Sequence, residues 1–213
     1  MANKLVTSLV LAVAVAGAQV PFSAEVLAAD AAQEKKKRPT QLVGPSVGKK
    51  VQKAFELYST DDIDGALAIL LDINAKKEYD KAYVARFIAV MYTTKGDHEQ
   101  KAIEYLNQAV GPDILNEKDQ GDGLKLLGDL QMQVQDYQNA LVNYQKWMDF
   151  TGEDDAQVWL KIANAYYSLK QMDKIIAPAD KAIAAFGDKH NQNPYILKIQ
   201  SYYERKMYPE AVK

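Results

Sequence analysis

Residues 156–187, AQVWLKIANAYYSLKQMDKIIAPADKAIAAFG, decide the fold of this chain. An apolar residue recurs at every third or fourth position of the first half: Trp159, Ile162, Ala163 and Tyr166. This spacing is the apolar stripe of an amphipathic helix, and it continues in the second half from Met172 to Phe186. Only a few polar residues separate the halves, and short connections make consecutive helices antiparallel neighbours. The stretch therefore predicts a helical hairpin that needs copies of itself to bury both arms.

The copies are present along most of the chain. One position in the first turn of each second helix, usually small, marks them: Ala66, Ala102, Ala140, Ile175 and Ala211. The intervals between these marks are 36, 38, 35 and 36 residues. The longest interval predicts a looser connection, for which 111–112 (Gly-Pro) and 121–123 (Gly-Asp-Gly) are the candidates. Pro178 falls inside a predicted second helix and is expected to bend it.

These copies resemble the tetratricopeptide repeat, whose period is about 34 residues. The matching residues are spread over different copies: Tyr92, Gly96, Gly128, Tyr137, Ala140, Tyr144, Trp159 and Ala182. The resemblance covers residues 46–213 and implies an all-α fold, a right-handed α–α superhelix of about five repeats with the last one incomplete. The alternative is an unrelated helical bundle that is periodic by chance. Because the last helix has only begun near Lys213, we also expect the chain to be a fragment of a longer array.

Residues 1–29 have the layout of a secretory signal peptide. Lys4 precedes an uncharged run from Leu5 to Ala18, and small residues follow it. This run is shorter than the roughly 20 residues that span a bilayer. We therefore expect cleavage, no stable membrane insertion afterwards and a periplasmic location; the alternative is an uncleaved anchor. The chain has no cysteine, so it has no disulfide and no thiolate metal site.

Residues 30–45 predict a flexible basic arm, because Lys35, Lys36, Lys37 and Arg38 form a run of positive charge next to Pro and Gly residues. The arm is either a solvated linker or a docking arm for an acidic partner or an anionic membrane surface. Residues 38–49, RPTQLVGPSVGK, followed by degenerate repeats, resemble the periplasmic repeat proteins associated with TonB energy-transduction clusters of gammaproteobacteria. That resemblance implies a partner in TonB-dependent uptake of iron chelates across the outer membrane.

No constellation of residues suggests catalysis, a metal or a cofactor. The two histidines, His98 and His190, stand in predicted turns without the company of the three or four ligands that zinc requires. The acidic residues at 61–64 fail as a calcium loop, because Leu71 falls where a bidentate Glu is required. We expect them to cap a helix instead. With 26 basic and 28 acidic residues, the chain also lacks the basic excess of a nucleic-acid binder.

The first helices of such repeats line the inner face of the array, where a partner is expected to bind. The predicted binding residues are Tyr83, Arg86, Lys125, Asp129, Asn164, Tyr167, Gln200 and Tyr203. Tyrosine offers a large contact area with one polar end, and amides bond a peptide backbone. In the repeat family, the best-known inner face grips a terminal carboxylate with Lys, Asn and Arg. Here Asp129 opposes that chemistry, so we expect a different ligand.

The sequence thus predicts a non-catalytic periplasmic scaffold that binds an envelope protein, a component of a TonB-type transport complex in the first instance. The alternatives are a periplasmic chaperone and an accessory factor for outer-membrane, pilus or cell-wall assembly. No cofactor is expected.

Overall fold

The structure is a computed structural model that describes residues 38, 40–187, 189 and 191–212. The predicted signal peptide and the arm residues Lys35, Lys36 and Lys37 lie outside the described residues. The described part contains helices and no strand. The helices are α1 (Pro45–Ser59), α2 (Ile63–Leu71), α3 (Glu78–Lys95), α4 (Glu99–Val110), α5 (Glu117–Gln133), α6 (Tyr137–Thr151), α7 (Ala156–Ser168), the 3-10 turn η2 (Met172–Lys174), α8 (Ile176–Phe186), α9 (Asn193–Glu204) and α10 (Tyr208–Ala211).

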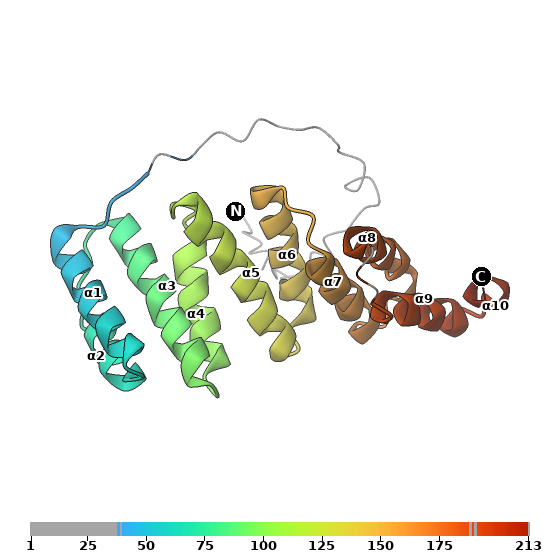
Figure 1. Ribbon diagram of the computed structural model, residues 1–213, viewed down its shortest axis with the longest axis horizontal. Coiled ribbons are helices and arrows are strands. Elements are labelled where there is room, and N and C mark those ends of the chain that lie inside the picture. Colours follow the sequence, from blue (N-terminus) through green and yellow to red (C-terminus); the bar gives the residue numbers. More distant parts are fainter. Residues whose placement is uncertain (1–37, 39, 188, 190, 213) are drawn as a thin grey trace, which may run out of the picture. The chain divides into compact units, whose positions relative to one another are not determined.

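The helices form five consecutive hairpins within the described part of the chain (Figure 1). Each odd-numbered helix, here called a first helix, packs on the even-numbered second helix that follows it, as α3 does on α4 and α5 on α6. Each second helix then packs on the next first helix. This arrangement is the solenoid of helical hairpins that the repeats predict, and the all-α fold class is confirmed.

The core lies between the two helices of each hairpin and between successive hairpins. Four register residues, Ala66, Ala102, Ala140 and Ile175, are fully buried, as the copies predict. The apolar stripe of α7 is also buried: Trp159, Ile162, Ala163 and Tyr166. Burial raises the pKa of the Tyr166 hydroxyl to about 12, and the Asp173 carboxylate adds to that rise. The small register residues allow the backbones of neighbouring helices to approach closely.

A repeated turn joins first and second helices. In four hairpins a non-glycine residue adopts a positive φ, and the next backbone N–H donates to a carbonyl five residues earlier. The four bonds run from Asp62 to Leu57, from Asp136 to Gln131, from Gln171 to Tyr166 and from Met207 to Tyr202. Asp62 and Asp136 then cap the second helices, because their carboxylates accept the N–H groups of Gly65 and Asn139. The expected capping role of the acidic turns is confirmed for Asp62.

The expectation of a loop at residues 121–123 is wrong. Residues 121–123 lie inside α5, where a Cβ on Gly123 would stand 2.6 Å from a Val110 methyl carbon. The glycine thus serves close helix packing rather than a loop. Pro178 stands in the first turn of α8, where its missing N–H would have no intrahelical partner, and the second helix of this hairpin is divided just before it into η2 and α8.

The 38-residue interval has a different origin from the one expected. The connection from α4 to α5 spans residues 111–116, as long as the connections 72–77 and 187–192. Compared with the preceding interval, the additional length lies in the second helix, since α4 has 12 residues where α2 has 9, while α5 has 17 where α3 has 18. A longer helix adds residues without loosening the stack.

Candidate partner-binding face

The first helices place six of the predicted binding residues in half-exposed positions. These residues form the inner face as the term is used below: Tyr83 and Arg86 of α3, Lys125 and Asp129 of α5, and Asn164 and Tyr167 of α7. Half-exposure results from the register, because the neighbouring positions on the same helices, such as Ala89, Gly128 and Ala163, turn into the core. The inner face is therefore accessible and held on rigid elements.

Arg86 links α3 to α5. Its Nη2 stands 3.1 Å from Asp119 Oδ1 and 3.8 Å from Asp122 Oδ2, and both aspartates lie in the first two turns of α5. The Arg86 side chain is 18% exposed and that of Asp119 is 21% exposed. Removal from water strengthens the attraction between the charges, and it makes either charge costly if left alone.

Lys125 links α5 to α7. Its Nζ lies 2.7 Å from Asp155 Oδ2 and 4.8 Å from the centre of the Trp147 ring. Asp155 also caps α7, since its Oδ1 accepts the N–H groups of Gln157 and Val158. Burial of the carboxyl opposes ionisation, but Lys125 and the two backbone N–H groups outweigh it and hold the pKa of Asp155 below its ordinary value.

Asp129 joins three elements. Its Oδ1 accepts a hydrogen bond from the Tyr144 hydroxyl of α6 at 2.6 Å and from Lys161 Nζ of α7 at 2.7 Å. Burial raises the pKa of Tyr144, and the carboxylate of Asp129 raises it further. The Tyr144 ring also lies against Gly128, where an added Cβ would stand 2.7 Å from the ring. Asp129 is thus a structural acceptor as well as a surface group.

The charges of the inner face are therefore neutralised by neighbours within the array. Arg86, Lys125 and Asp129 also contribute to packing between repeats, because each makes an ion pair to the next first helix or its cap. A cluster of free cations for a terminal carboxylate does not form from these residues. Their partners Asp119, Asp155 and Lys161 were not predicted from the sequence, although each stands one repeat away on a first helix or at its cap.

Three uncharged residues of the inner face keep polar atoms available. Tyr83 is flanked by Tyr79, with ring centroids 6.0 Å apart, and by Phe87 at 5.1 Å. Burial, with the nearby Asp119 carboxylate, raises the pKa of Tyr83. Asn164 Nδ2 donates to the Leu160 carbonyl at 2.9 Å, and its Oδ1 accepts no hydrogen bond within the described residues. Tyr167 lies beside Lys170, whose Nζ is 5.2 Å from the ring centre.

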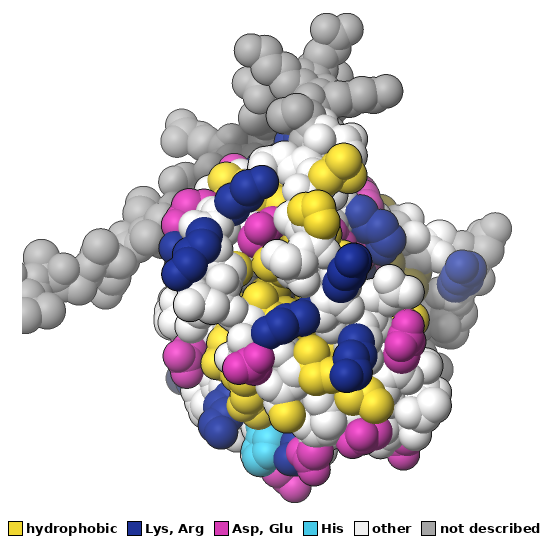
Figure 2. All heavy atoms as spheres, turned by 90° about the vertical axis from the view of Figure 1, so that its left-hand side faces the viewer, with side chains coloured by type: hydrophobic (Ala, Val, Ile, Leu, Met, Phe, Trp, Pro, Cys, Tyr) yellow, Lys and Arg dark blue, Asp and Glu magenta, His cyan; other side chains and the backbone are white. Residues whose placement is uncertain are grey.

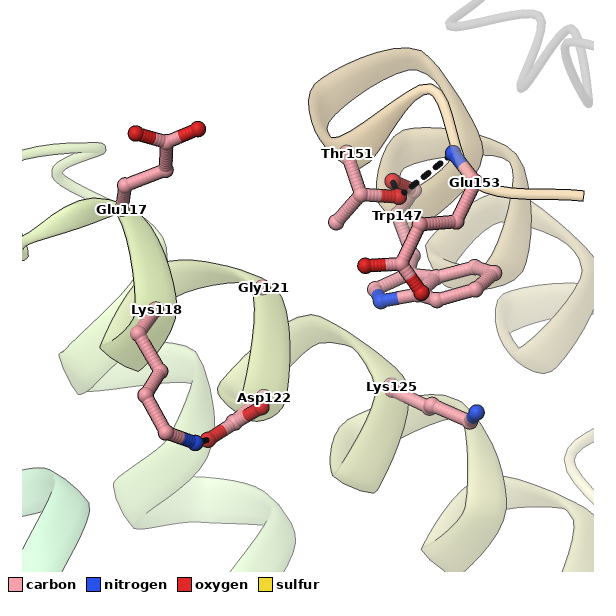
Figure 3. Close-up of a pocket in the computed structure, with 8 residues that line it drawn as sticks. All are labelled: Glu117, Lys118, Gly121, Asp122, Lys125, Trp147, Thr151 and Glu153. Carbon is pink, nitrogen blue, oxygen red and sulfur yellow. Dashed lines mark hydrogen bonds and ion pairs between the residues drawn. The ribbon is translucent and has the colours of Figure 1, made fainter. Parts of the chain in front are cut away.

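A cavity of about 510 Å³ opens beside Lys125 (Figure 3). The first half of α5 forms one wall, and the end of α6 with the start of its following loop forms the other. Its lining is Glu117, Lys118, Gly121, Asp122, Lys125, Trp147, Thr151 and Glu153. Lys118 pairs with Asp122 at 2.5 Å, and the Thr151 hydroxyl oxygen accepts the N–H of Glu153 at 3.1 Å. The cavity carries both signs of charge and an indole, which suits a polar peptide side chain better than an ion.

The remaining two predicted binding residues lie on α9, the first helix of the fifth hairpin. Gln200 is half-exposed, and Tyr203 is 64% exposed, with its ring edge-on to Tyr208 at 5.4 Å. α10 spans four residues, and Ile196 and Ile199 of α9 are exposed. Tyr202 of α9 is half-exposed, whereas Tyr92 and Tyr166 of earlier first helices are buried.

The opposite end of the array presents a mixed surface. Figure 2 shows basic, acidic and hydrophobic side chains interspersed over the end where α1 and α2 lie. Phe55 and Leu71 are exposed there, as are Lys49, Lys53 and Lys76. The aspartates of the first turn, such as Asp61, lie on the same hairpin. The alternation of sign does not form the continuous basic stripe that nucleic-acid binders use.

The described residues hold no group of three or more His, Asp or Glu side chains that could bind a metal ion. His98 precedes α4 and lies edge-on to Tyr92 at 5.7 Å, while His190 falls outside the described residues. Among the helices that the structure describes, none is long and apolar enough to cross a bilayer.

Solved structures of similar fold exist, although no protein-family model and no curated protein matches the sequence. A structure of MamA protein superposes with a TM-score of 0.64 and 19% identity, covering 80% of this chain and 88% of that one. MamA from Desulfovibrio magneticus RS-1 gives 0.61 and 15%, covering 80% and 92%. YrrB, described as a TPR protein with an unusual peptide-binding site, gives 0.60 and 16%, covering 76% and 79%. At these identities the likeness establishes the tetratricopeptide-repeat fold.

Proposed function

We propose that this protein is a non-catalytic scaffold whose inner face binds an extended segment of a protein partner. The proposal rests on the difference between the charged and the uncharged residues of that face. Arg86, Lys125 and Asp129 are paired within the array, whereas Tyr83, Asn164 and Tyr167 present an aromatic surface and an amide oxygen to solvent.

Such a surface suits a peptide chain. Tyrosine rings bury much area at a small loss of side-chain freedom, and interface hot spots are rich in tyrosine. An amide oxygen accepts a backbone N–H without selecting the side chain. The adjacent cavity of about 510 Å³ accommodates one projecting side chain of the ligand. YrrB, which shares the fold, is named for a peptide-binding site, and this supports a peptide ligand here.

The ligand's chemistry follows from the paired charges. A ligand that carried a free carboxylate would have to take Arg86 from Asp119 or Lys125 from Asp155, and either aspartate would then be left half-buried without its partner. An uncharged segment that offers aromatic and backbone groups can bind without breaking either ion pair. We therefore favour an internal peptide segment over a free C-terminus.

Selection from a random peptide library against the full chain tests the proposal. Enriched peptides should lose about thirtyfold in affinity with Tyr167→Ala, from a hot-spot loss of about 2 kcal/mol. Tyr137→Ala is the matched control, because Tyr137 is also half-exposed but begins the second helix α6. Thermal unfolding should be alike for both variants. Failure to enrich any peptide, or equal losses in both variants, would refute binding at the inner face.

The setting proposed for this scaffold is the periplasm, with a component of a TonB-type transport complex as the partner. This part rests on the leader-like sequence of residues 1–29 and on the resemblance of residues 38–49, and not on the fold. Cell fractionation with N-terminal sequencing of the mature protein tests the location. Recovery of the uncleaved chain from the cytoplasm would refute it.

A further inference from the structure

Residues 38 and 40–44 lie against the array, at an edge formed by the start of α3, the α4–α5 connection and the end of α6. In Figure 1 the segment, in blue, continues from the start of α1 past the near end of α3. Its last residue is anchored by Asp80, whose Oδ1 accepts the N–H of Gly44 at 3.0 Å. Asp80 is a carboxylate only 4% exposed, and a Cβ at position 44 would stand 2.8 Å from its Oδ2. A Cβ here would force the Asp80 carboxylate to shift, so glycine favours this contact.

The middle of the segment is held through its backbone. Asn116 Oδ1 accepts the N–H of Gln41 at 3.1 Å, and Asn116 Nδ2 donates to the Gln41 carbonyl at 3.5 Å. Asn116 is itself oriented by Tyr79, whose hydroxyl oxygen accepts from Nδ2 at 2.8 Å. One amide side chain thus satisfies both backbone groups of a single residue, which is how a protein holds an extended peptide.

Arg38 binds where the α4–α5 connection meets the end of α6. Its Nη2 lies 2.5 Å from Asp113 Oδ1, and its Nη1 donates to the carbonyls of Asp113 at 2.8 Å and Leu115 at 3.2 Å. The guanidinium also lies 4.5 Å from the centre of the Phe150 ring. Carboxylate, two carbonyls and an aromatic face together match a planar guanidinium and not an ammonium.

The receptor is the α4–α5 connection itself. The carbonyls of three consecutive residues, Asp113, Ile114 and Leu115, all accept from side chains of the segment, the middle one from Gln41 Nε2 at 3.1 Å. Asp113 adopts a left-handed backbone conformation with φ 55°. Without these side chains, the three carbonyls would need water as their hydrogen-bond donor. Arginine and glutamine three residues apart are the side chains that reach them.

We propose that this edge site, formed by Asp80, residues 113–116 and Phe150, is a second peptide-binding site that takes an extended segment with arginine three residues before glutamine. Residues 38–44 are its built-in occupant, and a segment of the same chemistry from another protein displaces them. The exposed Leu42 shows that the occupant is held at residues 38, 41 and 44 and not along its whole length. An occupant held at spaced points can be exchanged without unfolding the array.

The test uses the full chain and a synthetic peptide with the sequence of residues 37–44, KRPTQLVG, blocked at both ends. In the Arg38→Ala/Gln41→Ala chain the built-in occupant loses its side-chain contacts, so the peptide should bind saturably, seen as NMR shifts of the Asn116 side-chain amide. In the wild type the tethered segment competes at an effective concentration on the order of 1 mM. A peptide of about 0.1 mM dissociation constant should therefore bind the wild type roughly tenfold more weakly.

Two controls separate the edge site from general attraction to a basic peptide. Adding Asp113→Asn and Asn116→Ala to the double variant should abolish binding, while circular dichroism confirms that the array stays folded. A peptide with alanine in place of its arginine should bind at least tenfold more weakly. Equal affinity of the peptide for wild type and the double variant, or binding that survives loss of Asp113 and Asn116, would overturn the proposal. Neither outcome depends on the inner face, whose peptides are selected separately.

Discussion

The ion pair between Arg86 and Asp119 should contribute measurably to the free energy of unfolding, because it joins two neighbouring repeats. Asp119 is about one-fifth exposed in the intact pair, and replacing Arg86 with alanine removes the guanidinium 3.1 Å from its carboxylate. Exposed pairs contribute about 0.2–1 kcal/mol, and breaking a buried pair costs about 3–5 kcal/mol. At this intermediate exposure we expect a loss of about 1–2 kcal/mol. For an array of this size that lowers the melting temperature by roughly 2–8 °C.

A double-mutant cycle separates the ion pair from lost packing of the arginine stem. Urea unfolding of wild type, Arg86→Ala, Asp119→Ala and the double variant can be followed by the fluorescence of Trp147 and Trp159. We expect a coupling energy of about 1 kcal/mol that falls as salt is added, because the pair is partly solvated. A coupling below about 0.3 kcal/mol would show that Arg86 is free for a ligand and that the inner face is not internally neutralised.

Three further outcomes follow from single contacts. The pKa of Asp155 lies below its ordinary 3.8, so its pairing with Lys125 should stabilise the fold above pH 3.8. This stabilisation should be lost as the pH falls below 3.8 and through the lowered pKa. Asp155→Asn should remove this loss, measured as the melting temperature against pH. Gly128→Ala should lower the unfolding free energy by about 1–2 kcal/mol, because overpacking against Tyr144 outweighs the gain in helix propensity; equal or higher stability would contradict that contact. Asp62→Ala should cost about 1 kcal/mol through loss of the α2 cap, and thermal unfolding measures it.

The repeat and its core follow from the sequence because they depend on residues close together in the chain. The buried Ala66, Ala102 and Ala140 recur at a nearly constant interval, and periodicity shows such positions directly. The Asp62 cap is similarly local, since its ligand is the N–H three residues later. A local pattern with two physical explanations led to a wrong prediction. The glycines at 121 and 123 are as typical of a loop as of close contact between helices, and the structure shows close contact.

The candidate sites depend on pairs that are far apart in the sequence. Arg86 stands 33 residues from Asp119, and Arg38 stands 75 residues from Asp113. A single sequence shows that Arg86 reaches a first-helix face, but not that a carboxylate of the next repeat meets it. The sequence likewise predicted an arm at 30–45, while the contacts of Arg38 and Gln41 with the α4–α5 connection appear only in the structure.

The two surfaces select ligands by different physical rules. On the inner face the ion pairs are internal, so a ligand gains from Tyr83 and Tyr167 by burying area, and its affinity should change little with salt. At the edge site the carboxylate of Asp113 and the carbonyls beside it are already filled by Arg38, so a ligand must replace a guanidinium with a guanidinium. In the Arg38→Ala/Gln41→Ala chain the arginine of the peptide forms a new pair with Asp113, whose side chain is 64% exposed, so peptide binding to that variant should weaken as salt is added. The salt dependence of affinity for that variant therefore distinguishes a partner bound at the inner face from a partner bound at the edge site.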